Sequence, residues 1–323
     1  MINRELIRLK TVQTVWSYYV NGQSKSDEGF AESENELRKS LDKSYELYLT
    51  MLALLLEMRR LATDEMKQQE TRNRQLATES HIERRLAQNR WLAKLARNEQ
   101  IREFLDNNNQ LWFNEEETVR SLLRKYKASR AYRIYLESED NFAEDQEAIR
   151  QLYKEILIDD DELAETLEHL CIYWNDDRYI VDTFLVKTIR IINQDTPDDA
   201  PLLPQYDHPD DLEFAVKLHH FAIAQGDYYH ELINEHTRGW DFRRMALMDV
   251  VIMQTALAEI TSFPSIPLAV SINEYVNIAK MYTAPRNSSY INATLDTIAH
   301  KLLDEKKITK SQDKDVQKAK GGQ

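Results

Sequence analysis

Apolar residues recur at intervals of three and four along most of the chain, a spacing typical of amphipathic helices. The first such segment covers residues 3–20 and ends at Asn21-Gly22, where glycine can adopt a left-handed cap. The polar stretch 23–35 is predicted to be a loop, and a long helix is predicted over residues 36–67. The same pattern predicts later helical segments over residues 149–157, 182–193, 212–224, 227–236, 242–261, 267–281 and 288–303, the last with Ser288 or Ser289 as its N-cap.

Glycine and proline are scarce, and their distribution supports an all-α fold. The 323 residues include only 6 Gly and 7 Pro, and four of the prolines fall within residues 194–211. That segment is therefore predicted to be a non-helical connector. The polar, lysine-rich end of the chain, residues 304–323, is predicted to be a disordered tail.

The charge distribution limits how this chain could bind a polyanion. Its formal net charge of -13 disfavours indiscriminate nucleic-acid binding, so any such site must be a local patch. Residues 59–102 hold 11 Lys/Arg against 6 Asp/Glu. This segment is either an added, nonspecific RNA-binding surface or a solvated face balanced by acidic neighbours.

No motif for catalysis or cofactor binding is present, so no cofactor and no enzymatic activity are expected. The sequence lacks a glycine-rich phosphate loop and a GxSxG nucleophile turn. The single cysteine, Cys171, excludes zinc sites built on cysteine pairs and fits a reducing compartment. Because no signal peptide or membrane-spanning segment is visible either, a cytoplasmic protein is expected.

Histidine and aspartate fall at metal-ligand spacing at only one place. Asp227 and His230 are three residues apart on a predicted helix, and His219, His220 and His236 lie nearby. A di-iron bundle would need two Glu-x-x-His pairs and two further glutamates. We therefore interpret these side chains as structural and expect no metal site.

Two runs at opposite ends of the chain are similar to the NusB family. ALMDVVIMQTALAEI (246–260), SIP (265–267), VSINEYVNIAKMY (270–282) and YINATLDTIA (290–299) follow that family's C-terminal helices in order and spacing. Arg8 followed by VQTVW (12–16) resembles its first helix. Gln254 stands where the family usually has a basic residue, Asp249 where it has Glu, and Ser265 where a loop usually carries Asp.

The resemblance implies a NusB-like helical bundle of two subdomains, lengthened by a large helical insertion. Residues 1–22 would form its first helix, 23–141 the insertion, 142–303 the helical core and 304–323 the tail. It also implies an RNA-binding antitermination factor that acts on the boxA element of ribosomal RNA leaders, with the ribosomal protein NusE, in the RNA polymerase antitermination complex.

The implied binding residues come from three segments. Arg4, Arg8 and Lys10 are expected on the exposed side of the first helix, where they could contact phosphates, while Gln13 could reach base edges. Arg286 and Asn287, before the last helix, would extend the RNA surface, and Trp16 and Asp249 match positions that meet the protein partner.

Each assignment has a structural alternative. Trp16 could pack in the core, and Arg4 and Arg8 could be solvated. The chain could also be a protein-binding scaffold that has kept the fold and lost specific RNA binding. NusB-like domains also occur fused to RNA methyltransferases, but no cofactor loop follows here. The sequence leaves homodimer formation open.

Overall fold

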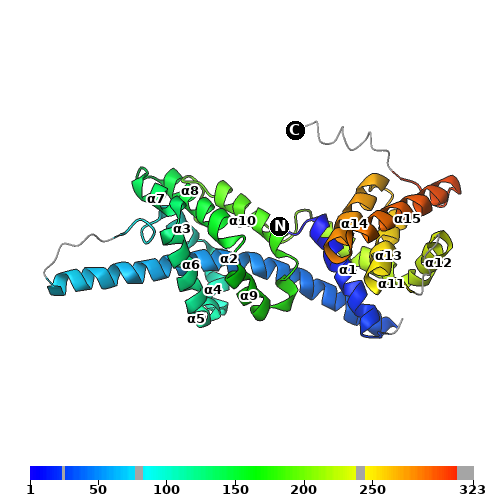
Figure 1. The fold of residues 1–323 in the computed structure, drawn as a ribbon, viewed down its shortest axis with the longest axis horizontal. Coiled ribbons are helices and arrows are strands. Elements are labelled where there is room, and N and C mark those ends of the chain that lie inside the picture. The colour runs from blue at the N-terminus through cyan, green and yellow to red at the C-terminus, as the bar shows by residue number, and fades with distance from the viewer. Residues whose placement is uncertain (24–25, 77–82, 238–243, 311–323) are drawn as a thin grey trace. The chain divides into compact units, whose positions relative to one another are not determined.

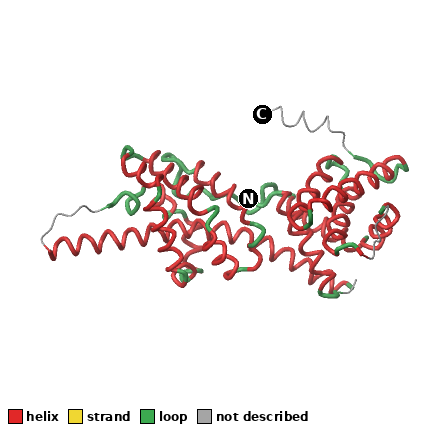
Figure 2. Tube along the Cα trace, viewed as in Figure 1, coloured by secondary structure: helices red, strands yellow, loops and turns green. Residues whose placement is uncertain are grey.

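The computed structural model describes residues 1–23, 26–76, 83–237 and 244–310. Within these ranges the chain is helical, and Figure 2 shows no strand there; Ile2 and Tyr206 form one isolated bridge. The predicted all-α class is confirmed. No helix in the described ranges has an apolar stretch long enough to cross a bilayer.

The elements follow one another in the order labelled in Figure 1. They are α1 (Arg4–Val20), α2 (Asp27–Leu76), α3 (Arg90–Leu95), α4 (Glu99–Asn107), α5 (Leu111–Asn114), α6 (Glu116–Ala128), α7 (Arg130–Glu137), α8 (Phe142–Leu152), a π-helical turn η1 (Tyr153–Leu157), α9 (Asp161–Leu170), a 3-10 turn η2 (Ile172–Trp174), α10 (Arg178–Ile191), α11 (Asp211–Ala224), α12 (Gly226–His236), α13 (Leu247–Ser262), α14 (Leu268–Tyr282) and α15 (Pro285–Asp304).

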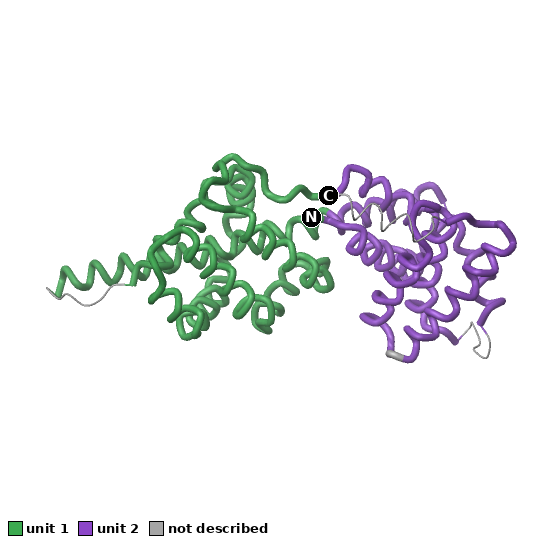
Figure 3. The backbone as a smooth tube through the Cα atoms, turned by 90° about the horizontal axis from the view of Figure 1, so that it is seen from above, with its two compact units in different colours: residues 1, 42–205 green, residues 2–41, 206–323 purple. Residues whose placement is uncertain are grey.

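The chain divides into two compact units, coloured separately in Figure 3. Unit 1 comprises Met1 and residues 42–205, and unit 2 comprises residues 2–41 and 206–323. Helix α2 contributes residues to both units. The limits expected from the sequence differ from this division, because they grouped residues 142–303 together.

Unit 2 is built around α13. Residues 249–260 of this helix are all buried, as expected for a helix that is apolar on nearly every side. Helices α1, α11, α12, α14 and α15 pack around it. The side chain of Asn3 caps α1 by accepting a hydrogen bond from the backbone N–H of Leu6 at 3.0 Å.

Three tryptophans of unit 1 form long-range hydrogen bonds through their indole N–H groups. Trp91 donates to the carbonyl of Ile192 at 3.1 Å, and Trp112 donates to that of Thr50 at 2.9 Å. Trp174 donates to the carbonyl of Lys43 at 2.7 Å. Each bond satisfies a polar group while the ring fills the core. The bonds of Trp112 and Trp174 join later parts of the unit to α2, and that of Trp91 joins α3 to the end of α10.

Helix α8 belongs to unit 1 because it packs on α3, α7 and α10. Asn89, just before α3, donates to the backbone carbonyl of Asp145 at 2.9 Å, and the Asp145 side chain accepts from the backbone N–H of Arg90 at 2.9 Å. These long-range bonds explain why the sequence-based limit at residue 142 does not coincide with the boundary between the units.

Several helices begin earlier than predicted, among them α2 and α15. The segment 23–35 was expected to be a loop, yet α2 begins at Asp27, where the Ser26 hydroxyl accepts from the N–H of Gly29 at 3.2 Å. Helix α15 begins at Pro285 rather than after Ser288, because proline needs no N–H partner in the first turn.

The end of the described chain is packed against unit 2. Ile308 is buried, and the Lys310 ammonium donates to the carbonyl of Phe263 at 2.9 Å. Residues 304–310 are therefore ordered, contrary to the expected tail. Residues 311–323 of that tail lie outside the described residues.

Candidate functional site

Arg8 is the centre of a buried charge network in unit 2. Its side chain forms two hydrogen bonds with Glu259, Nε to Oε2 at 2.7 Å and Nη2 to Oε1 at 2.9 Å. Ser271 and Tyr275 also donate to the Glu259 carboxylate, at 2.8 Å and 3.2 Å. Burial alone would lower the pKa of Arg8, but the adjacent carboxylate outweighs it and raises that pKa.

The expectation that Arg8 and Lys10 lie on the exposed side of α1 is therefore wrong. Arg8 is 4% exposed and Lys10 is 1% exposed. The sequence shows two cations near the start of a helix, but the glutamate that neutralises Arg8 is 251 residues away. Arg8 acts in this structure as a core residue that ties α1 to α13.

Arg4 has a more open position at the start of α1. Its side chain is 40% exposed, lies 3.3 Å from Asp211 and has its guanidinium 4.8 Å from the centre of the Phe214 ring. Part of the guanidinium remains accessible, so Arg4 can still contact a phosphate.

The other expected site residues gather around the turn between α14 and α15. Gln13 donates to the Tyr282 hydroxyl at 2.7 Å, which joins the middle of α1 to the last residue of α14. Asn287 donates to Asp249 Oδ2 at 2.9 Å, which joins the first turn of α15 to the first turn of α13. We call this set the α14–α15 corner; it comprises Gln13, Trp16, Asp249, Tyr282, Arg286 and Asn287.

The corner combines exposed and half-buried groups. Trp16 is 37% exposed, one turn beyond Gln13, and Arg286 is exposed. The pKa of the Asp249 carboxyl lies above its ordinary value, because the effect of burial is larger than the opposite effect of the hydrogen bond from Asn287. Asp249 lies beneath these surface groups at 2% exposed, and its Oδ1 is buried without a hydrogen-bond partner among the described residues. Tyr282 was not singled out from the sequence, because an aromatic residue at a helix end carries no local signal of function.

Gln254, the position where the family usually has a basic residue, lies inside unit 2. It is fully buried and donates to the Tyr19 hydroxyl at 2.9 Å and to the carbonyl of Ala222 at 2.7 Å. Its amide oxygen is 2.8 Å from His230 Nε2. The amide thus joins α1, α11, α12 and α13, and it does not form part of the surface at the corner.

The histidines considered as metal ligands have other partners. Burial lowers the pKa of His219 to about 4, and its Nε2 lies 2.8 Å from the Ser33 hydroxyl. His236 Nδ1 is 2.7 Å from the carbonyl of Leu232. Across the described ranges, no three His, Cys, Asp or Glu side chains are placed to hold a metal ion.

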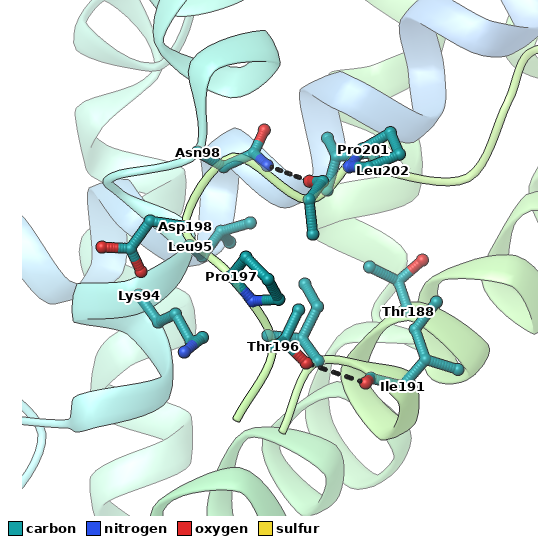
Figure 4. Close-up of a pocket in the computed structure, with 12 residues that line it drawn as sticks. Lys94, Leu95, Asn98, Thr188, Ile191, Thr196, Pro197, Asp198, Pro201 and Leu202 are labelled. Atoms are coloured by element: carbon teal, nitrogen blue, oxygen red, sulfur yellow. Dashed lines mark hydrogen bonds between the residues drawn. The ribbon is translucent and has the colours of Figure 1, made fainter. Parts of the chain in front are cut away.

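Unit 1 contains an apolar cleft of about 510 Å³ beneath the proline-rich connector (Figure 4). Leu95, Ile191 and Pro197 line it, and Asn98 holds the connector over it by donating to the carbonyl of Ala200 at 2.8 Å. The connector predicted from the prolines is thus an ordered strap. The cleft's polar side chains bond mainly to the strap itself.

Replacing Asn98 with alanine should lower the free energy of unfolding of unit 1 by about 2 kcal/mol, because one side chain has two roles. Besides holding the strap, its Oδ1 accepts from the N–H of Ile101 and caps α4. Urea denaturation followed by tryptophan fluorescence measures the effect. Asn98→Asp keeps the capping acceptor without the donor and should cost about half as much. An unchanged midpoint for Asn98→Ala would contradict the assignment.

The fold and the corner define a class of protein: a helical bundle whose candidate functional side chains meet at helix ends on its surface. Comparison with known proteins shows which family the chain resembles. Residues 186–300 match the model of the NusB family. The chain is 37% identical to the transcription antitermination protein NusB of Koribacter versatilis over 94 residues, which are 29% of this chain and 64% of that protein.

Two further relatives extend the match. The chain is 30% identical to NusB of Geotalea daltonii over 133 residues, covering 41% of this chain and 89% of that protein. It is 32% identical to NusB of Dictyoglomus turgidum over 100 residues, covering 31% and 69%. The chain therefore belongs to the NusB family, as an elongated member with a large additional helical region. No solved structure matches it significantly.

Proposed function

We propose that this protein is a transcription antitermination factor that binds RNA through the α14–α15 corner. The observation that carries the proposal is the convergence of Gln13, Asp249, Arg286 and Asn287, drawn from three helices of the family-matched fold, at one corner. The relatives named above are transcription antitermination proteins.

The corner has the chemistry that recognition of single-stranded RNA requires. Arg286 supplies charge for phosphates, whereas the amides of Gln13 and Asn287 can hydrogen-bond to base edges. The partly exposed Arg4, at the start of α1 and outside the corner, would supply a further charge. The buried Arg8 and Lys10 act in this proposal by fixing α1, not by touching RNA. The RNA proposed is the boxA element of ribosomal RNA leaders, bound in the cytoplasm.

A protein partner would bind beside the RNA at Trp16 and Asp249. Trp16 offers an exposed aromatic surface, whereas Asp249 is 2% exposed and would act in this proposal by holding Asn287 through its hydrogen bond. Aromatic residues of this kind commonly dominate interface energies. We propose NusE as this partner and the RNA polymerase antitermination complex as the assembly in which both act.

We further propose that residues 2–41 and 206–310 form the part that carries this function, with residues 42–205 as an insertion. A scaffold that keeps the fold without RNA binding is the competing function. The buried Gln254 favours it, because this chain lacks a cation at the position where the family usually has one.

Fluorescence anisotropy with a labelled boxA-type RNA tests the corner directly. Arg286→Ala should weaken binding about threefold to tenfold and reduce the steepness of its salt dependence by about one phosphate contact. Lys217→Ala on α11 removes the same charge from unit 2 away from the corner and should leave binding unchanged. Gln13→Ala should reduce the preference for boxA-type over scrambled RNA, because its amide is proposed to contact bases. Equal affinities for Arg286→Ala and Lys217→Ala would exclude the corner as the site.

A further inference from the structure

The last ten residues of α2 form a helical segment that buries none of its side chains. The sequence Lys67–Leu76 is exposed or half-exposed at every position, and Leu76 is 58% exposed. Figures 1 and 3 both show this end of α2 extending past the other helices of unit 1. A helix stabilised by burial has one apolar face, and this segment has none.

The segment stays helical because it continues α2, whose preceding turns are packed in the core of unit 1. Leu52, Leu55 and Met58 of α2 are buried in unit 1, so the unfavourable nucleation step is already made. Glu70 and Arg74, one turn apart, add a weak pair at 3.9 Å. The segment therefore continues the helix into solvent as a polar helix that buries none of its own side chains.

The side chains on this projecting helix are mainly cations and amides. The ten residues KQQETRNRQL contain three Lys/Arg, one Glu, three Gln and one Asn. Glu70 also pairs with Arg84 at 3.1 Å, and Glu65, just before the segment, pairs with Lys127. In the described part of the chain, Lys67 and Arg72 have no ion pair and remain available to an external anion.

Charge is strongly separated along unit 1. Residues 59–133 carry 17 Lys/Arg against 11 Asp/Glu, whereas residues 134–205 carry 5 against 19. The acidic stretch leaves the net charge of the chain negative, so an anionic partner is repelled there and attracted only to the basic stretch.

We propose that the projecting helix, residues 67–76, is a second RNA-binding surface, separate from the α14–α15 corner. Its cations fit phosphates, and its three glutamine amides can donate to and accept from base edges, a combination that an acidic peptide would not use. A ten-residue helix is about 15 Å long, enough to follow several nucleotides of a single strand or an opened stem. The insertion would thereby lengthen the RNA contact beyond the site proposed for the NusB-like part.

Fluorescence anisotropy of the full chain with a labelled uridine 20-mer tests this proposal. The variant Lys67→Gln/Arg72→Gln/Arg74→Gln removes three charges and keeps helix propensity, because Gln, Lys and Arg are nearly equivalent helix formers. The control variant Lys154→Gln/Lys187→Gln/Arg190→Gln removes three exposed charges from the acidic stretch of the same unit. Circular dichroism verifies that both variants remain folded.

The helix variant should bind the uridine 20-mer at least about tenfold more weakly than wild type, with a shallower salt dependence, whereas the control should bind as wild type does. Unlabelled poly-glutamate should compete poorly, because it lacks bases. Equal affinities for the two variants, no binding by wild type, or competition by poly-glutamate as strong as by RNA would each overturn the proposal. The Arg286→Ala variant should retain its contact with the 20-mer through the helix, so failure at the corner and failure at the helix are distinguishable.

Discussion

Replacement of Arg8 with methionine should lower the free energy of unfolding by about 3 to 5 kcal/mol, the largest effect expected for a single substitution here. Methionine has a similar length but leaves the Glu259 carboxylate buried without its counter-charge. The charge on Glu259 cannot be solvated, because both side chains are at most 5% exposed. Chemical denaturation in urea measures the loss.

Two further variants separate the ion pair from simple loss of packing. Arg8→Met/Glu259→Gln removes both charges and should recover a large part of the lost stability, because no unpaired charge remains buried. Arg38→Met removes an exposed pair with Glu34 in the same unit and should change stability by less than about 1 kcal/mol. A loss for Arg8→Met no larger than that for Arg38→Met would contradict the buried network.

His219 in unit 2 and Asp182 in unit 1 should contribute to the pH dependence of stability with opposite signs, because burial displaces the pKa of each. Burial lowers the pKa of His219 in unit 2 from 6.5 to about 4. Between these values the unfolded chain binds a proton that the folded chain does not, so acidification destabilises unit 2. Burial raises the pKa of Asp182 in unit 1 from 3.8 to about 6. Here the folded chain binds the extra proton, so acidification stabilises unit 1.

Urea denaturation at pH 7 and pH 5 measures both contributions as differences between wild type and variant. Relative to His219→Gln, wild type should lose about 2 kcal/mol between pH 7 and pH 5. Relative to Asp182→Asn, it should gain about 1 kcal/mol over the same interval. A difference for either pair that does not change with pH would show that the group titrates normally and is not held in its buried environment.

Local patterns sufficed for much of the fold. The apolar stripe of α1 and the prolines of the connector each gave the correct element because the forces involved act within a few residues. The start of α2 was missed since residues 27–35 are mostly polar. That segment is helical in the structure because it reaches a tertiary partner: Ser33 is buried against His219. No local pattern carries that information.

The lack of information about tertiary partners also explains which site residues the sequence placed correctly and which it did not. Gln13, Trp16, Asp249, Arg286 and Asn287 were each proposed separately, and the structure joins Gln13 to Tyr282 and Asn287 to Asp249. Arg8 and Lys10 were expected outside because charged residues are rarely buried. Only the fold reveals that α13 brings Glu259 to Arg8. The extent of the insertion was also uncertain from sequence, because α8 and α10 pack on α3 through bonds that span more than 50 residues.

The central claim is that this NusB-family protein selects an RNA through the α14–α15 corner. The most direct measurement is the ratio of wild-type affinities for a labelled boxA-type RNA and its scrambled control, at one fixed salt concentration, with and without NusE. We expect a clear preference for the boxA-type RNA that increases when NusE is bound and is reduced in Gln13→Ala. Equal affinity for the two RNAs, with NusE present and bound, would contradict RNA selection at the corner and leave the protein-binding scaffold as the function of this fold.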